Sequence, residues 1–94
     1  MRPVLVVQGQ SLLDADHPST LIVPLTTNLV NDAEPLRLRI LAQERLDHDS
    51  DLLIDQLRAI DNRRLSAGPL ARLSATDMRT VYRAIVEVLE IPEQ

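Results

Sequence analysis

The clearest structural signal in the sequence lies in the C-terminal part of the chain, where the residues follow the pattern of an amphipathic helix. Its apolar residues recur with the period of one helix face, at Met78, Val81, Ile85 and Leu89. Ser74 is suited to cap the helix, Asp77 places an acid in the first turn, and Pro92 marks the end. The sequence therefore predicts one helix over about residues 75–90, and the residues before it must fold in another way.

The preceding residues form short apolar runs with the composition of β-strands. Strands are expected at Pro3–Gln8, Thr20–Thr27, Leu36–Leu41, Leu52–Ile60 and Leu70–Leu73. In the third run Arg37 and Arg39 alternate with apolar residues, so both should share the solvent face. Pro24 has no N–H for a neighbouring strand, and the second run should be an edge or carry a bulge there. The polar Asp61–Arg64 predicts a turn or short helix. These elements indicate a small α+β domain on a strongly curved sheet or barrel.

Composition and charge limit the classes of function. A chain of 94 residues fits one domain, and no linker or repeat divides it. Cysteine is absent, which excludes disulfides and thiol nucleophiles. No run approaches the roughly 20 apolar residues of a membrane span, so we expect a cytoplasmic protein without a membrane partner. All ten basic residues are arginine and the net charge is −4, which disfavours general attraction to nucleic acid, although an arginine fork still binds a phosphate locally.

The residues alone do not predict a metal site. Asp47, Asp49 and Asp51 imitate the first ligands of a calcium loop, but Leu52 stands where glycine is required and no glutamate closes the loop. The two histidines lie in polar, loop-like segments and are not paired at a metal-ligand spacing. We therefore expect neither a metal nor another cofactor.

Four segments occur in the order that is typical of one bacterial family. They read RPVLVVQ (Arg2–Gln8), LIVPLTTN (Leu21–Asn28), DSDLLIDQLRAIDNRRL (Asp49–Leu65) and ARLSATDM (Ala71–Met78). In this order the chain resembles the MazF/PemK toxins of type II toxin–antitoxin systems. The resemblance implies an antiparallel, SH3-like barrel and sequence-specific cleavage of single-stranded RNA without a metal, leaving a 2′,3′-cyclic phosphate. It also implies a homodimer whose groove is neutralised by a cognate antitoxin.

The resemblance assigns catalytic roles to two residues. The arginine of the family's Arg-Pro pair is Arg2 here, and it is expected to contact the scissile phosphate as proton donor or charge stabiliser. The threonine of the Pro-x-Thr segment is Thr26, which should hydrogen-bond the same phosphate. Attack by the 2′-hydroxyl gathers negative charge on the phosphorane oxygens, and a guanidinium and a hydroxyl placed there stabilise that charge.

Further residues are expected to bind RNA or to shape its groove. Thr27 and Asn28 follow the catalytic threonine, and Asp55 and Gln56 match the family's Asp-Gln pair at the centre of a long strand. Some members carry an arginine two residues before that aspartate, where this chain has Leu53. For Asp55 and Gln56 a purely structural polar pair is the competing interpretation.

Two other functions compete with RNA cleavage. Family members begin with a further strand and a loop over the RNA site, whereas Met1 here directly precedes the Arg-Pro pair. Residues 1–94 are thus expected to form an N-terminally abbreviated toxin domain. One alternative is a catalytically weak or inactive paralogue that still dimerises and binds antitoxin. The other is a gyrase-poisoning toxin of the same fold, but those toxins depend on a terminal tryptophan and this chain has none.

Overall fold

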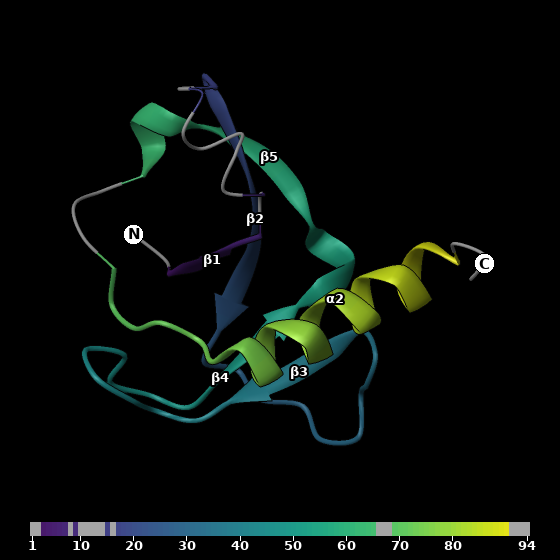
Figure 1. The fold of residues 1–94 in the computed structure, drawn as a ribbon. Coiled ribbons are helices and arrows are strands. Elements are labelled where there is room, and N and C mark those ends of the chain that lie inside the picture. The colour runs from purple at the N-terminus through teal and green to yellow at the C-terminus, as the bar shows by residue number, and fades with distance from the viewer. Residues whose placement is uncertain (1–2, 8, 10–14, 16, 66–68, 91–94) are drawn as a thin grey trace.

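The computed structural model describes residues 3–7, 9, 15, 17–65 and 69–90 as five strands, two short 3-10 helices and one α-helix (Figure 1). In chain order these are β1 (Val4–Val6), β2 (Ser19–Thr26), β3 (Arg37–Ile40), β4 (Ser50–Leu53), η1 (Ile54–Gln56), β5 (Arg58–Asp61), η2 (Asn62–Arg64) and α2 (Ala75–Leu89). The expected C-terminal helix is confirmed, as is the short helix after residue 61. Among the described residues no helix is long and apolar enough to cross a membrane.

All strand pairs of the sheet are antiparallel, and β2 lies at its centre. The hydrogen-bonded path runs β1-β2-β4-β3, and β5 also pairs with β2. Figure 1 shows the consequence, with β2 and β5 rising away from the β3–β4 pair. The predicted α+β fold with a strongly curved antiparallel sheet is confirmed. The described strands leave the sheet open, so they do not form a closed barrel.

The expectation of one continuous strand over Leu52–Ile60 is wrong, because η1 interrupts it. On one side of η1, Ile22 lies opposite Arg58. An unbroken ladder would then place Thr26 opposite Ile54, but Thr26 lies opposite Asp51. The register slips by three residues, which is the length of η1. The 3-10 turn is thus a large bulge in the strand that accompanies β2.

Pro24 lies at this slip, which explains why β2 tolerates it. The amide of Leu25 donates to the carbonyl of Pro3 at 3.2 Å, so odd-numbered residues of β2 direct their backbone groups toward β1. The neighbouring position 24 faces the other side, where pairing with β5 ends at Ile22 and pairing with β4 begins at Leu25. The missing N–H therefore falls in the gap. The predicted edge is wrong, since β2 is central, and the break lies in the partner strand.

The short strand expected at Leu70–Leu73 is also wrong, since this segment has no regular secondary structure. Its start is held by Arg45, whose amide donates to the carbonyl of Leu70 at 2.9 Å and whose Nη2 donates to the carbonyl of Pro69 at 2.9 Å. Ala71 and Leu73 are half-buried and pack against the hydrophobic core. Their alternation therefore reflects packing on the way into α2, and not pairing with a strand.

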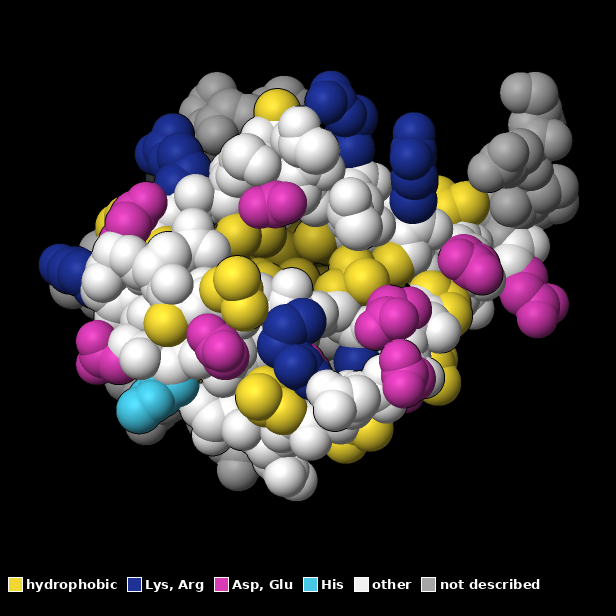
Figure 2. Space-filling model, turned by 90° about the horizontal axis from the view of Figure 1, so that it is seen from below, with side chains coloured by type: hydrophobic (Ala, Val, Ile, Leu, Met, Phe, Trp, Pro, Cys, Tyr) yellow, Lys and Arg dark blue, Asp and Glu magenta, His cyan; other side chains and the backbone are white. Residues whose placement is uncertain are grey.

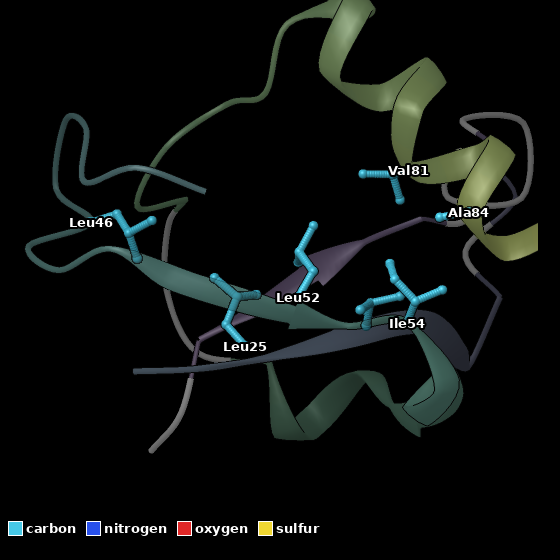
Figure 3. Close-up of a cluster of buried hydrophobic side chains, with 7 residues drawn as sticks. Leu25, Leu46, Leu52, Ile54, Val81 and Ala84 are labelled. Atoms are coloured by element: carbon cyan, nitrogen blue, oxygen red, sulfur yellow. The ribbon is translucent and has the colours of Figure 1, made fainter. Parts of the chain in front are cut away.

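The core lies between one face of the sheet and α2 (Figure 3). Its buried members are Val23, Leu25, Leu46, Leu52, Ile54, Val81 and Ala84. Ser74 fixes the start of the helix by accepting a 3.1 Å hydrogen bond from the amide of Asp77. Because strand residues alternate between faces, Leu25 and Leu52 point toward α2 and their neighbours point away from it. The face without the helix carries the buried Ile22 and Leu53 together with polar residues, among them Thr26 and Asp51.

Leu52→Ala should lower the free energy of unfolding by about 2–4 kcal/mol, because Leu52 is 1% exposed and its loss leaves a cavity under α2. Urea unfolding at fixed protein concentration measures this difference. Leu70→Ala is the matched control, since Leu70 is 40% exposed, and it should change the stability by less than about 1 kcal/mol. Equal effects of the two substitutions would contradict this position of the core.

Candidate functional site

Thr26 ends β2 and begins a tight polar turn. Its Oγ1 atom accepts a 3.1 Å hydrogen bond from the amide of Asn28. A hydroxyl has one donor and two acceptor positions, so this bond occupies an acceptor and leaves the hydrogen for another oxygen. Thr26 is half-buried, whereas Thr27 and Asn28 are exposed. The turn therefore presents a hydroxyl donor on a rigid strand end, next to two exposed polar residues.

Beside Thr26 in the register lies Asp51, a buried carboxylate on the face without the helix. Its side chain is 2% exposed and receives three hydrogen bonds. They come from the amide of Val30 at 2.9 Å, Nε of Arg39 at 2.5 Å and Nη1 of Arg37 at 3.4 Å. Burial alone would raise the pKa of Asp51. The hydrogen bonds and the charge of Arg39 outweigh burial and hold the pKa below its ordinary value.

The two arginines connect this carboxylate to the loop between β2 and β3. Nη1 of Arg37 donates to the carbonyl of Asn28 at 3.0 Å. Nη2 of Arg39 donates to Oδ1 of Asn31 at 3.0 Å and to the carbonyl of Val30 at 3.4 Å. Both arginines share one face, as the alternation predicted. They are not simply solvated, because each one holds the loop that follows Thr26.

This cluster is the part of the site that sequence reasoning missed. Asp51 looked like part of a calcium loop, but its carboxylate binds Arg37 and Arg39, while Asp49 accepts from the amide of Ala42 at 2.7 Å. In the part of the chain that the structure describes, no group of three or more possible ligands could hold a metal ion. An acid directly before the apolar Leu52 and Leu53, together with two alternating arginines, was the available signal.

Two hollows flank the turn after Thr26. One, of about 310 Å³, is lined by Val30, Asn31, Asp32, Glu34, Arg37, Arg39 and Asp51. The other, of about 420 Å³, is lined by Thr27, Leu29, Ala42, Asp47, His48 and Asp49. Polar groups thus surround the loop on both sides, and Thr27 faces a hollow that also contains an imidazole.

The remaining predicted residues lie in two other places. Asp55 and Gln56 are exposed on η1, which Ile54 anchors in the core, so their expected position at the centre of a long strand is wrong. The bulge projects them into solvent. No hydrogen bond among the described residues joins them to the Thr26 turn. Arg2 lies outside the described residues. The carbonyl of the next residue, Pro3, accepts a hydrogen bond from the amide of Leu25, which directly precedes Thr26.

Comparison with known proteins identifies the class to which this fold and this site belong. Residues 1–89 match the family described as PemK-like, MazF-like toxin of type II toxin-antitoxin system, and the chain belongs to that family. It is 33% identical over 87 residues to the endoribonuclease MazF of Staphylococcus saprophyticus, a match that covers 90% of this chain and 70% of that protein.

Solved structures share the same fold at lower sequence identity. The Mycobacterium tuberculosis toxin MazF-mt6 superposes with a TM-score of 0.83 at 20% identity, covering 98% of this chain and 89% of that one. A chain of the MazE-MazF structure (Form-III) from Deinococcus radiodurans gives 0.77 at 21% identity, covering 97% and 87%. These matches establish the fold, and the site must be argued from the residues of this chain.

Asp51→Asn should lower the free energy of unfolding at pH 7 by about 2 kcal/mol, because Arg37 and Arg39 lose their buried anion. Both arginine side chains are partly exposed, so the loss of stability is smaller than for a fully buried ion pair. The pKa of Asp51 is lower in the folded protein than in the unfolded chain, where it is about 3.9. The charged carboxylate therefore stabilises the fold fully above about pH 3.9, and this contribution is lost as the pH falls through the pKa of the folded state. The difference between the two proteins should therefore shrink below about pH 4.

Denaturant unfolding from pH 3 to pH 7 measures this dependence. Asp61→Asn is the matched control, because that carboxylate pairs with the exposed Arg63 at 2.9 Å, and the substitution should matter much less. A stability difference for Asp51→Asn that stays constant down to pH 3 would contradict the assigned charge.

Proposed function

We propose that this chain is a metal-independent endoribonuclease that cleaves single-stranded RNA as the toxin of a toxin–antitoxin pair. In the reaction the 2′-oxygen bonds to phosphorus and the bond from phosphorus to the 5′-oxygen breaks. The 2′-hydroxyl loses its proton and the leaving oxygen gains one. The observation that carries the proposal is the hydroxyl of Thr26, which keeps its hydrogen for a substrate oxygen while Asn28 holds its acceptor side.

Charge neutralisation in this proposal comes from the protein. Negative charge develops on the phosphorane oxygens, where the Thr26 hydroxyl donates a hydrogen bond and the guanidinium of Arg2 supplies positive charge or a proton. Thr27 and Asn28 are exposed beside that hydroxyl and are available to contact the neighbouring nucleotides. Asp55 and Gln56 project from η1 and would shape a more distant part of the RNA path. The relative named an endoribonuclease supports this activity.

Thr26→Ala and Arg2→Ala should each lower the cleavage rate about 100- to 1,000-fold, because each removes a donor to the developing oxyanion. Arg2→Lys should also lose most of the rate if the guanidinium binds two phosphate oxygens, since lysine keeps the charge but not the fork. Single-turnover cleavage of a fluorescent RNA measures these rates, with thermal unfolding as the check on folding.

Thr76→Ala and Arg79→Ala provide the controls, because both residues are exposed on α2. Arg37 is unsuitable as a control, since it holds the carbonyl of Asn28. A chelator should leave cleavage unchanged. Loss of cleavage with chelator and recovery with a divalent ion would replace the proposed chemistry by metal catalysis.

We further infer that the chain forms a cytoplasmic homodimer that its cognate antitoxin inhibits. The solved MazE-MazF structure of Deinococcus radiodurans supports an antitoxin partner. Residues 22–25 of β2 are buried within the protomer, so they offer no surface to a second copy. Exposed apolar residues lie instead beside β3 and on α2: Leu36, Leu41, Tyr82 and Leu89.

The surface between α2 and β3 is the proposed dimer face. In Figure 2, seen from below Figure 1, hydrophobic side chains gather in a hollow at the centre of the face, with charged side chains around it. β3 ends the described path of strands, and Leu38 and Ile40 reach from it toward the core below α2. A second copy placed here would cover apolar surface that the protomer leaves in water.

Light scattering at micromolar concentration should therefore report a dimer, and Tyr82→Asp should shift it toward the monomer, because Tyr82 is 45% exposed on α2. Val6→Asp is the control: Val6 is 37% exposed on β1, at the other end of the strand path. A wild-type monomer, or equal dissociation by both substitutions, would refute this interface.

A further inference from the structure

We propose that Asp51 is a positioning residue for RNA cleavage: through Arg37 and the loop after β2, it fixes the direction of the Thr26 hydroxyl. The catalytic half of this inference rests on the proposed function. The structural half concerns only the turn and can be measured without RNA. Asp51 itself lies too deep to meet a substrate, with its side chain 2% exposed.

The register of three neighbouring strands aligns Thr26, Asp51 and Arg39. Thr26 on β2 lies opposite Asp51 on β4, and Asp51 lies opposite Arg39 on β3. Residues opposite one another in antiparallel strands share a face. These three side chains therefore form one row across the face without the helix. Asp51 is the middle residue of the row, so a change in its position affects the surroundings of both Thr26 and Arg39.

Asn28 is held at both of its backbone groups. Its amide donates to Oγ1 of Thr26 at 3.1 Å, and its carbonyl accepts from Nη1 of Arg37 at 3.0 Å. The same Nη1 atom contacts the carboxylate of Asp51 at 3.4 Å. A continuous path of polar contacts thus joins the buried carboxylate to the hydroxyl of Thr26. If Arg37 moves, the amide of Asn28 is no longer fixed beside that hydroxyl.

The loop has a second attachment two residues further along, at Val30. The carboxylate of Asp51 accepts from the amide of Val30, and Arg39 donates to the carbonyl of the same residue. Val30 is therefore held at both its backbone groups, like Asn28. The turn has two fixed points on the same ion-pair cluster, which restricts the backbone between Thr26 and Asn31.

Stability alone does not account for the buried carboxylate of Asp51. It lies in β4 beside Leu52 and Leu53, which are buried, and a strand in that position is normally apolar. Replacing a buried ion pair by apolar residues is often neutral or stabilising, so such a cluster is better explained by the geometry that it imposes. Here that geometry is the turn that presents Thr26.

The structural test uses NMR on the full chain without RNA. In the wild-type protein Thr26 should populate one χ1 rotamer, and the amides of Asn28 and Val30 should exchange slowly. Asp51→Asn should average the Thr26 rotamers and raise amide exchange about tenfold or more at both positions. Arg37→Met should have the same effect on Thr26 and on the amide of Asn28, while the amide of Val30 keeps its hydrogen bond to Asp51. Asp61→Asn, which removes an exposed partner of Arg63, should change neither. A single Thr26 rotamer and unchanged exchange in Arg37→Met would overturn the inference.

The catalytic test is a double-mutant cycle on cleavage. Asp51→Asn and Arg37→Met should each lower kcat about 10- to 100-fold with little change in KM, since the hydroxyl is present but misdirected. In the Thr26→Ala background they should change the residual rate less than about twofold, because their effect acts through that hydroxyl. If the double variant instead loses kcat by the product of the two single-variant losses, Asp51 and Arg37 act independently of Thr26 and the inference is overturned.

The two arms separate failure of this inference from failure of the proposed function. If the wild-type chain does not cleave RNA, or if Thr26→Ala keeps the wild-type rate, the proposed function and the catalytic half fail together, while NMR still decides whether Asp51 holds the turn. If Asp51→Asn does not fold, Arg37→Met carries both tests. In that variant Asp51 retains Arg39 and the amide of Val30.

Discussion

The register slip opposite β2 is the constraint on which the rest of the structure depends. Pro24 gives β2 a position without an N–H, and η1 removes three residues of the partner strand from the ladder at that point. The partner is thereby divided into β4, which joins β3, and β5, which returns along the start of β2. The bulge turns the sheet, brings Ile54 under α2 and leaves Asp55 and Gln56 in solvent.

The chain has few positive charges available to attract RNA, and all of them are arginines. All ten cations are arginine, and the net charge is −4. Two of the ten, Arg37 and Arg39, bind Asp51 and the loop after β2, so they serve the shape of the site more than its potential. Long-range attraction for RNA is therefore weak, and binding must depend on local contacts. In the proposed reaction, the hydroxyl of Thr26 and the guanidinium of Arg2 would supply those contacts.

Family membership establishes the class of protein, and the contacts of this chain define the geometry of its site. The match over residues 1–89 places the chain among PemK-like and MazF-like toxins. Solved MazF toxins share its fold at about one fifth identity, so the backbone arrangement tolerates replacement of most side chains. The Asp51 cluster is argued from this chain's own contacts. It shows how one sequence secures the turn after β2 with a buried ion pair.

The sequence by itself determined the elements whose signals are local. The cap at Ser74 and the helical spacing up to Leu89 define α2, and the alternation around Arg37 and Arg39 defines β3. The order of the segments indicated the family and the candidate Thr26, because this order is read along the chain and does not depend on which segments meet in space.

Only the tertiary structure decided the features that depend on distant pairs. The division of Leu52–Ile60 follows from the pairing of Ile22 with Arg58 and of Thr26 with Asp51, and no pattern within that segment encodes the slip. The alternation at Ala71 and Leu73 likewise arises from packing against the core. Asp51 became part of the site because folding removed its carboxylate from water beside two arginines. Desolvation and long-range pairing are properties of the assembled sheet, which is why a linear sequence predicted the strands better than the cluster between them.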